Sequence, residues 1–125
     1  MKFTRMRMSY RSQNLLGQIK VRTGLTPNIA GRFALCLSLK DQSIPNPEEF
    51  DEKGSEIAPQ VLFGDYEDIF LALFIFRLKK DGLDPELYLN RMLRAHFNRG
   101  TISLYSRIKD IRSEEHTSEL QSLRH

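Results

Sequence analysis

Residues Arg22–Leu39 read RTGLTPNIAGRFALCLSL, and this stretch predicts the end of one helix followed at once by the start of another. Gly24 suits the left-handed position just after a helix, because a residue without a Cβ adopts that conformation without strain. Thr26 and Pro27 suit the N-cap and the first position of the next helix, since proline has no N–H to leave unpaired there. The apolar row of this second helix repeats every four residues at Ile29, Phe33 and Leu37, with Ala30, Ala34 and Cys36 alongside.

The residues before this stretch predict one more helix and a short strand. Residues 11–23 form the predicted helix, whose apolar face consists of Leu15, Leu16 and Ile19. Residues 2–8 alternate in type, which favours a strand with Phe3, Arg5 and Arg7 on one face and Thr4, Met6 and Met8 on the other. A strand, a helix, a glycine turn and a second helix outline the start of a ribbon-helix-helix DNA-binding unit.

A third helix is predicted after an acidic, proline-containing loop at residues 41–64. It starts from a cap at Asp65, and nine of the ten residues 69–78 are apolar. A helix that is apolar all round is expected to be buried on every side. Because a domain this small has difficulty surrounding a helix alone, we expect the chain to form a homo-oligomer. The alternatives are a monomer and a helix that a different protein covers.

Two further helices complete the predicted fold. Asp84 and Pro85 begin the fourth helix, Gly100 ends it, and residues 101–111 form the fifth. The sequence therefore predicts a mainly α-helical single domain at residues 1–112, with about five helices and a short N-terminal strand.

The last residues do not resemble the rest of the domain. Residues 112–122 read RSEEHTSELQS, which resembles the conceptual translation of a sequencing-library adapter. This string has one apolar residue and no helical apolar stripe, so we expect residues 113–125 to be a disordered, non-native tail. His116 and His125 are therefore excluded as candidate ligands.

The charges fall in blocks along the chain. The first forty residues contain eight Lys or Arg and no Asp or Glu, whereas residues 41–70 contain nine acids and Lys53 as the only base. An acid-free basic segment is typical of a protein with a polyphosphate partner, because ordinary surfaces mix both signs. The acidic block predicts a solvated loop that either screens the basic segment or keeps phosphate away from one side.

Nine basic side chains are candidate contacts to the backbone of double-stranded DNA. The first candidates are Arg5, Arg7, Arg11, Lys20, Arg22 and Arg32, and the secondary candidates are Arg91, Arg94 and Arg99. Phosphate contacts of this kind supply affinity but no sequence information. Base readout needs side chains such as Gln13, Asn14 and Asn28, which serve equally well as caps or surface residues.

Little in the sequence predicts catalysis. A single cysteine excludes an intramolecular disulfide framework and cannot hold a metal alone, so Cys36 is expected to be a buried structural thiol. His96 is expected to be a packing residue, because no carboxylate or cysteine accompanies it. Asp65, Glu67 and Asp68 could form a metal cluster for strand nicking, but acids at a helix start are more simply cap and dipole partners. We therefore predict no cofactor, no metal site and no enzymatic activity.

The sequence also predicts a cytoplasmic protein without a membrane span. Residues 1–8 are basic but precede no apolar stretch of the kind found in a secretory signal. The longest apolar run, residues 69–76, is too short to cross a bilayer.

Several short motifs follow one another along the chain: Arg11-x-x-x-Leu15, Arg22–Ile29, Arg32-x-Ala34, Ser38-Leu39, Leu62–Asp65 and Ala95-His96-x-Asn98-Arg99-Gly100. In this order and spacing they resemble the DndE family of DNA sulfur modification proteins. The resemblance extends from about Lys2 to Ile111. The N-terminal motifs, from Arg11 to Leu39, and the later motifs, from Leu62 to Gly100, are together more specific than either group alone.

The resemblance implies a function that composition does not show. It implies a non-catalytic DNA-binding component of the phosphorothioation system, in which sulfur replaces a non-bridging phosphate oxygen. It also implies partner subunits (a cysteine desulfurase, an iron–sulfur protein and an ATPase), self-assembly and a preference for nicked duplex DNA. The alternatives are a ribbon-helix-helix transcriptional regulator, a metal-dependent nicking enzyme, and an assembly adaptor whose basic segment docks an acidic partner.

Overall fold

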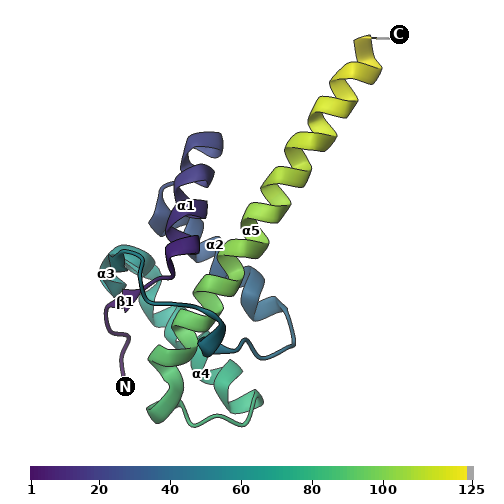
Figure 1. Cartoon of the computed structure of the whole chain (residues 1–125). Helices are drawn as coiled ribbons and strands as arrows, with labels where there is room; N and C mark the ends of the chain where they lie inside the picture. Colours follow the sequence, from purple (N-terminus) through teal and green to yellow (C-terminus); the bar gives the residue numbers. More distant parts are fainter. Residues whose placement is uncertain (124–125) are drawn as a thin grey trace.

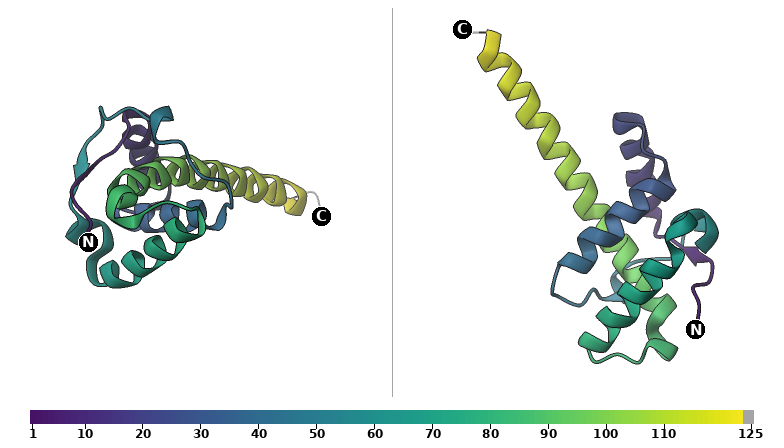
Figure 2. Two further views of the ribbon diagram at one scale, coloured as in Figure 1. Left: turned by 90° about the horizontal axis from the view of Figure 1, so that it is seen from below. Right: turned by 180° about the vertical axis from the view of Figure 1, so that it is seen from behind.

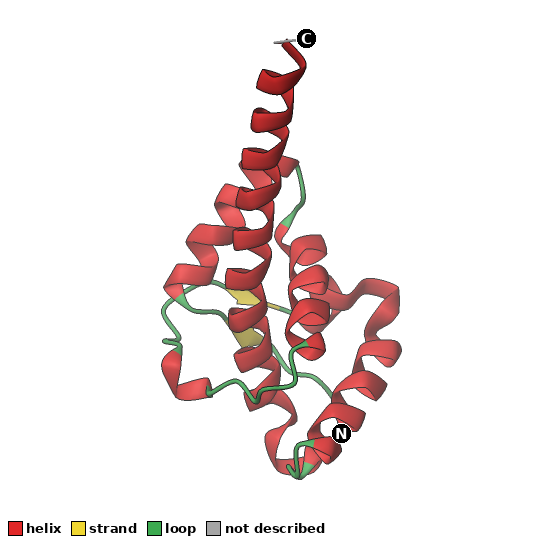
Figure 3. Cartoon of the chain, turned by 90° about the vertical axis from the view of Figure 1, so that its right-hand side faces the viewer, coloured by secondary structure: helices red, strands yellow, loops and turns green. Residues whose placement is uncertain are grey.

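The computed structural model of the chain describes the backbone of residues 1–123 and the side chains of residues 1–111 (Figure 1). Its elements, in chain order, are β1 (Met6–Arg7), α1 (Tyr10–Thr23), α2 (Pro27–Lys40), the 3-10 turn η1 (Pro47–Glu49), β2 (Glu56–Ile57), α3 (Pro59–Phe63), the 3-10 turn η2 (Gly64–Tyr66), α4 (Glu67–Lys80) and α5 (Pro85–Leu123). Helices dominate the fold and the strands are short (Figure 3). The predicted mainly α class with a short N-terminal strand is confirmed.

The long helix α5 is the axis of the domain. Helices α1, α2 and α4 each pack against it, and Figure 2 shows these elements gathered around its first half, beyond which α5 projects. The helix begins at Pro85, as the Asp84-Pro85 pair predicted, and it buries Leu89, Leu93 and Phe97.

Gly100 does not end this helix, which contradicts the prediction. It lies inside α5 where the α2 backbone crosses closely, and a Cβ added to it would lie 1.8 Å from the Ala34 carbonyl oxygen. Gly31 of α2 faces the same crossing, since a Cβ there would lie 2.7 Å from the Phe97 ring. The glycine therefore permits a close helix–helix contact, and the predicted fourth and fifth helices are one element.

The close crossing explains why the centre of the predicted apolar face of α2 was wrong, although Ala30 and Ala34 beside it are buried as predicted. The buried positions of α2 are mainly small: Ala30, Gly31, Ala34, Leu35 and Ser38. Phe33 is 53% exposed, and Ile29 and Leu37 are half-buried. Cys36 shares this outer side of α2 and is exposed, so the prediction of a buried thiol was also wrong. Desolvation raises the pKa of its thiol, the opposite of what an activated nucleophile needs.

The N-terminal strand is shorter than predicted and pairs within the chain. Met6 is opposite Ile57 and Arg7 is opposite Glu56 in an antiparallel pair. Phe3 is buried rather than sharing the exposed side of Arg7, because it stacks on Phe63 at 4.6 Å between ring centroids. A strand that pairs with β2 of its own chain differs from the two-chain ribbon of a ribbon-helix-helix dimer.

Helix α4 is apolar all round but not buried on every side, contrary to the prediction. Its buried face contains Phe70, Phe74 and Leu78. Its other face exposes Ile69, Leu73 and Phe76, of which Phe76 is 71% exposed. The helix also starts later than predicted, since Asp65 lies in η2 and Tyr66 occupies the N-cap position.

Two predictions concern the chain ends and the membrane. Among the described residues, no helix combines the length and apolar character that crossing a bilayer requires. The α5 backbone continues to Leu123, but the side chains of residues 112–125 and the structure of residues 124–125 lie outside the described part. The disorder and foreign origin of residues 113–125 therefore stay a prediction.

Candidate nucleic-acid interface

The extended N-terminal arm is fastened to α5 by one side chain. The Asn90 Oδ1 atom accepts a 2.8 Å hydrogen bond from the Thr4 N–H, and its Nδ2 donates to the Lys2 carbonyl at 3.1 Å. The Asn90 amide thus makes the two hydrogen bonds that a neighbouring strand would otherwise make to the Thr4 N–H and the Lys2 carbonyl. Arg5, which follows in the arm, is thereby placed near Arg91 of α5.

The arm, α5 and the loop around η1 enclose a cleft of about 570 Å³, which we call the arginine cleft. Its charged lining is Arg5, Arg7, Arg91, Arg94, Glu48 and Glu52, and the remaining lining is Met6, Pro47, Phe50 and Asn90. Four guanidinium groups outnumber these two carboxylates and the Glu56 carboxylate that pairs with Arg7 from outside the lining, so the cleft is positively charged. Guanidinium groups match the geometry of phosphate oxygens, so the cleft has the chemistry of a phosphate site.

Arg94 forms the floor of this cleft and serves the fold. Its Nη1 atom donates to the Phe50 and Asp51 carbonyls at 3.1 and 3.0 Å, and its Nη2 donates to the Pro47 carbonyl at 2.9 Å. Its side chain is only 14% exposed. Arg94 therefore anchors the acidic loop to α5, although its charge still contributes to the potential in the cleft.

Three carboxylates of the acidic loop pair with the arginines of the cleft. The nearest atoms are 2.9 Å apart for Arg7 and Glu56, 3.1 Å for Arg91 and Glu48, and 3.6 Å for Arg94 and Glu52. The loop thus screens part of the basic surface, one of the two roles the sequence left open. The Arg7 and Arg91 pairs are solvent-exposed, and such pairs contribute only about 0–1 kcal/mol each.

The other predicted contacts lie elsewhere. Arg11 and Arg99 line a neighbouring hollow of about 350 Å³. Lys20 and Arg22 lie near the C-terminal end of α1, where the Arg22 guanidinium is 5.5 Å from the centroid of the Tyr105 ring. Arg32 lies on α2 and donates from Nε to the Leu62 carbonyl at 2.6 Å. The nine candidates therefore form one group of four, one pair and a dispersed remainder.

The amide side chains considered for base readout also lie on different elements. Gln13 and Asn14 are exposed on α1, and Asn14 lines a shallow hollow with Arg22. Asn28 lies at the start of α2, where its Oδ1 accepts a 2.5 Å hydrogen bond from the Thr26 hydroxyl.

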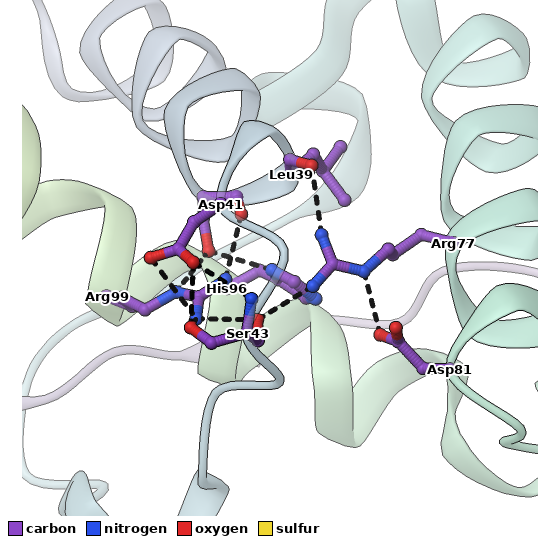
Figure 4. Close-up of polar contacts among 8 residues, drawn as sticks. Leu39, Asp41, Ser43, Arg77, Asp81, His96 and Arg99 are labelled. Carbon is purple, nitrogen blue, oxygen red and sulfur yellow. Dashed lines mark hydrogen bonds and ion pairs between the residues drawn. The ribbon is translucent and has the colours of Figure 1, made fainter.

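A buried polar cluster that includes Arg77 and Arg99 holds the segment after α2 in place (Figure 4). Arg77 of α4 is 6% exposed, and its guanidinium bonds the Asp81 carboxylate at 2.7 Å, the Leu39 carbonyl at 2.9 Å and the Ser43 carbonyl at 2.7 Å. Arg99 of α5 donates to the same Ser43 carbonyl at 2.8 Å. Arg99, like Arg94, thus serves the fold.

His96 lies at the centre of this cluster and is fully buried. Its Nδ1 atom is 2.8 Å from the Ser38 hydroxyl, and its Nε2 atom has no hydrogen-bond partner within the described residues. Burial, with the positive charges of Arg77 and Arg99, lowers its pKa to about 3. The imidazole is therefore neutral near pH 7 and packs edge-on against Phe74, which agrees with a packing role.

The alternative metal cluster finds no support in this geometry. Among the described residues, no three His, Cys, Asp or Glu side chains converge as metal ligands would. This includes Asp65, Glu67 and Asp68 at the start of α4.

Three residues that hold the arm and the buried cluster in place were not predicted from the sequence: Asn90, Arg77 and Asp81. Asn90 gave no signal, because an asparagine within a helix has no pattern that marks a distant backbone partner. Arg77 and Asp81 did give one, since an Arg–Asp pair spaced by four residues on a helix is typical of an ion pair.

Comparisons with known proteins agree with the motif resemblance. No match was found among the curated proteins. A crystal structure of DndE from Escherichia coli B7A, involved in DNA phosphorothioation modification, superposes with a TM-score of 0.66 at 25% identity, covering 83% of this chain and 99% of that one. A crystal structure of a DndE mutant gives the same TM-score and coverage at 22% identity, which shows the fold. The family model for DNA sulphur modification protein DndE matches residues 5–112, so this chain belongs to the DndE family.

Proposed function

We propose that this chain is a non-catalytic, DNA-binding accessory subunit of the phosphorothioation machinery and that it contacts the sugar–phosphate backbone. The arginine cleft carries the proposal, because it gathers Arg5, Arg7, Arg91 and Arg94 beside an extended arm. The family supports it, since the related crystal structure is described as involved in DNA phosphorothioation modification.

The proposed contact set leaves out two of the nine basic candidates, Arg94 and Arg99, whose guanidinium groups hold loop backbone. Arg5, Arg7, Arg11, Lys20, Arg22, Arg32 and Arg91 are the proposed phosphate contacts. Arg94 and Arg99 donate to several backbone carbonyls each, so their main contribution is to the shape and potential of the surface. The proposed partners are double-stranded DNA, with nicked duplex preferred, and the other subunits of the sulfur-modification complex.

The double substitution Arg5→Ala with Arg91→Ala is expected to weaken DNA binding and to make it less dependent on salt. Each lost phosphate contact lowers the slope of log K against log salt by about 0.9, so the slope should fall by about two units. The measurement is fluorescence anisotropy at several salt concentrations with intact, nicked and single-stranded DNA. The proposed preference for nicked duplex is read from the same titrations.

The matched control is Lys40→Ala with Arg107→Ala. Both residues are exposed and line a hollow between α2 and α5, and Arg107 lies sixteen residues after Arg91, or about 24 Å along the helix. The control removes the same net charge and should leave most of the salt slope intact. Equal losses in both double variants would mean that net charge alone drives binding, and unchanged binding in the cleft variant would refute the site.

We also propose that the chain forms a homo-oligomer through the exposed face of α4. Ile69, Leu73 and Phe76 follow one another on this face at helical spacing and are 59%, 45% and 71% exposed. A contiguous exposed apolar face on a small domain is typical of a protein–protein contact.

The substitution Phe76→Glu is expected to shift the particle mass toward that of a monomer, because it places a charge in the proposed apolar contact. The measurement is light scattering coupled to size-exclusion chromatography. Gln60→Glu, at an exposed position of α3, adds the same charge outside this face and should not change the mass. If the unsubstituted chain is itself monomeric, the proposal of self-association fails.

A further inference from the structure

The arginine cleft contains carboxylates where a bound phosphate would be expected. Glu48 lies 3.1 Å from the Arg91 guanidinium, and its side chain is 76% exposed. Glu52 faces Arg94 from the same loop and is 68% exposed. Arg5 lines the cleft too, but no carboxylate of the described residues lies within ion-pair distance of it. In the cleft, the Arg5 guanidinium therefore has no carboxylate partner among the described residues, and the Arg91 guanidinium is paired with the exposed Glu48 carboxylate.

The loop that carries these carboxylates is fixed through its backbone. Arg94 binds three of its carbonyl oxygens, and the Asp51 carboxylate accepts hydrogen bonds from the Tyr10 and Lys53 N–H groups at 3.0 and 2.9 Å. These backbone hydrogen bonds lower the pKa of Asp51 and keep it charged. Glu48 can therefore leave Arg91 by side-chain rotation alone, without movement of the loop.

We propose that the arginine cleft is a phosphate-binding subsite and that Glu48 occupies it as an internal competitor in the DNA-free protein. Arg5 and Arg91 both line the cleft, so we expect a phosphate bound there to accept hydrogen bonds from both, whereas the Glu48 carboxylate contacts only Arg91 among the described residues. The phosphate therefore displaces the carboxylate. This inference rests on the proposed DNA-backbone function and adds a regulator to it.

The test is a double-mutant cycle on DNA affinity between Glu48→Gln and Arg91→Ala. Glu48→Gln alone is expected to raise affinity about two- to five-fold at low salt, the range for an exposed ion pair. In the Arg91→Ala background the same substitution should bring little gain, because its partner is absent. Asp110→Asn removes an equal charge at an exposed position nineteen residues after Arg91 on α5, and it controls for net charge.

The outcomes separate this inference from the function on which it rests. A Glu48→Gln gain no larger than that of Asp110→Asn, or one that persists without Arg91, overturns the competitor while DNA binding stands. If the chain does not bind DNA, the proposed function fails, and titration with inorganic phosphate tests the subsite alone. Shifts of the Arg5 and Arg91 side-chain N–H resonances in that titration support an anion site for free phosphate, and unchanged resonances refute the subsite.

Discussion

Replacing Gly100 by alanine is expected to lower the free energy of unfolding by about 3 kcal/mol, near the upper end for an overpacked core. The added methyl group would lie 1.8 Å from the Ala34 carbonyl oxygen and 2.4 Å from its carbon. These are backbone atoms, so no side-chain rotation relieves the clash, and α2 must move away from α5. The measurement is urea unfolding followed by circular dichroism.

Gly17→Ala is the matched control for this substitution. Gly17 also lies within a helix, but a Cβ there meets nothing within 4 Å. Alanine is favoured over glycine within a helix by about 1 kcal/mol, so this variant should be more stable than the parent. The two identical substitutions are thus expected to have opposite signs. A Gly100→Ala protein as stable as the parent would mean that α2 and α5 do not cross this closely.

Replacing Arg77 by methionine is expected to cost about 3–5 kcal/mol, the usual result of removing one partner of a buried ion pair. Asp81 would lose its cationic partner although its side chain is only 7% exposed, and the Leu39 and Ser43 carbonyls would each lose a donor. Methionine preserves much of the volume, so the loss reports the polar contacts rather than a cavity.

Two variants check this explanation of the Arg77 result. Lys79→Met, at an exposed position two residues later in α4, should change stability by less than about 0.5 kcal/mol. Adding Asp81→Asn to Arg77→Met should recover part of the loss, because it removes the uncompensated charge. A single-variant loss below about 1 kcal/mol would show that water reaches the cluster and replaces the guanidinium.

Local signals predicted the helix boundaries well. Gly24 has φ of 79° after α1, and α2 and α5 begin at the prolines that follow Thr26 and Asp84. Caps and prolines act through the backbone of their own few residues, so they can be read without the rest of the fold. The role of Gly100 could not be predicted in this way, because a glycine is required there by the backbone of α2, which lies some sixty-five positions earlier in the chain.

Hydrophobic spacing predicted faces less reliably. Phe33 was assigned to the apolar row of α2, but the close approach of α5 leaves room only for small side chains such as Ala34 on the buried side. Helix α4 is apolar on both faces, so its sequence could not show that Phe74 is inside and Phe76 outside. Which face is covered depends on neighbouring elements, and periodicity does not contain that information.

The sequence predicted which kind of residue lines the candidate site, but not which of the candidate arginines lie together. Charge counting identified Arg5, Arg7 and Arg91 as candidates, and the fold brings them to one cleft. It could not distinguish them from Arg94 and Arg99, whose guanidinium groups are used within the domain. A basic residue on the surface and one that binds backbone carbonyls look the same in a sequence.

The central position of α5 has a consequence for how the protein is made. Ser9 donates its N–H, and Ser12 its hydroxyl, to the Asn98 side chain, eighty-six or more positions later. Helices α1, α2 and α4 are therefore translated before the element against which they pack. The native domain can be completed only after α5 has been synthesised, and until then the nascent chain lacks the helix that covers the apolar faces of α1, α2 and α4.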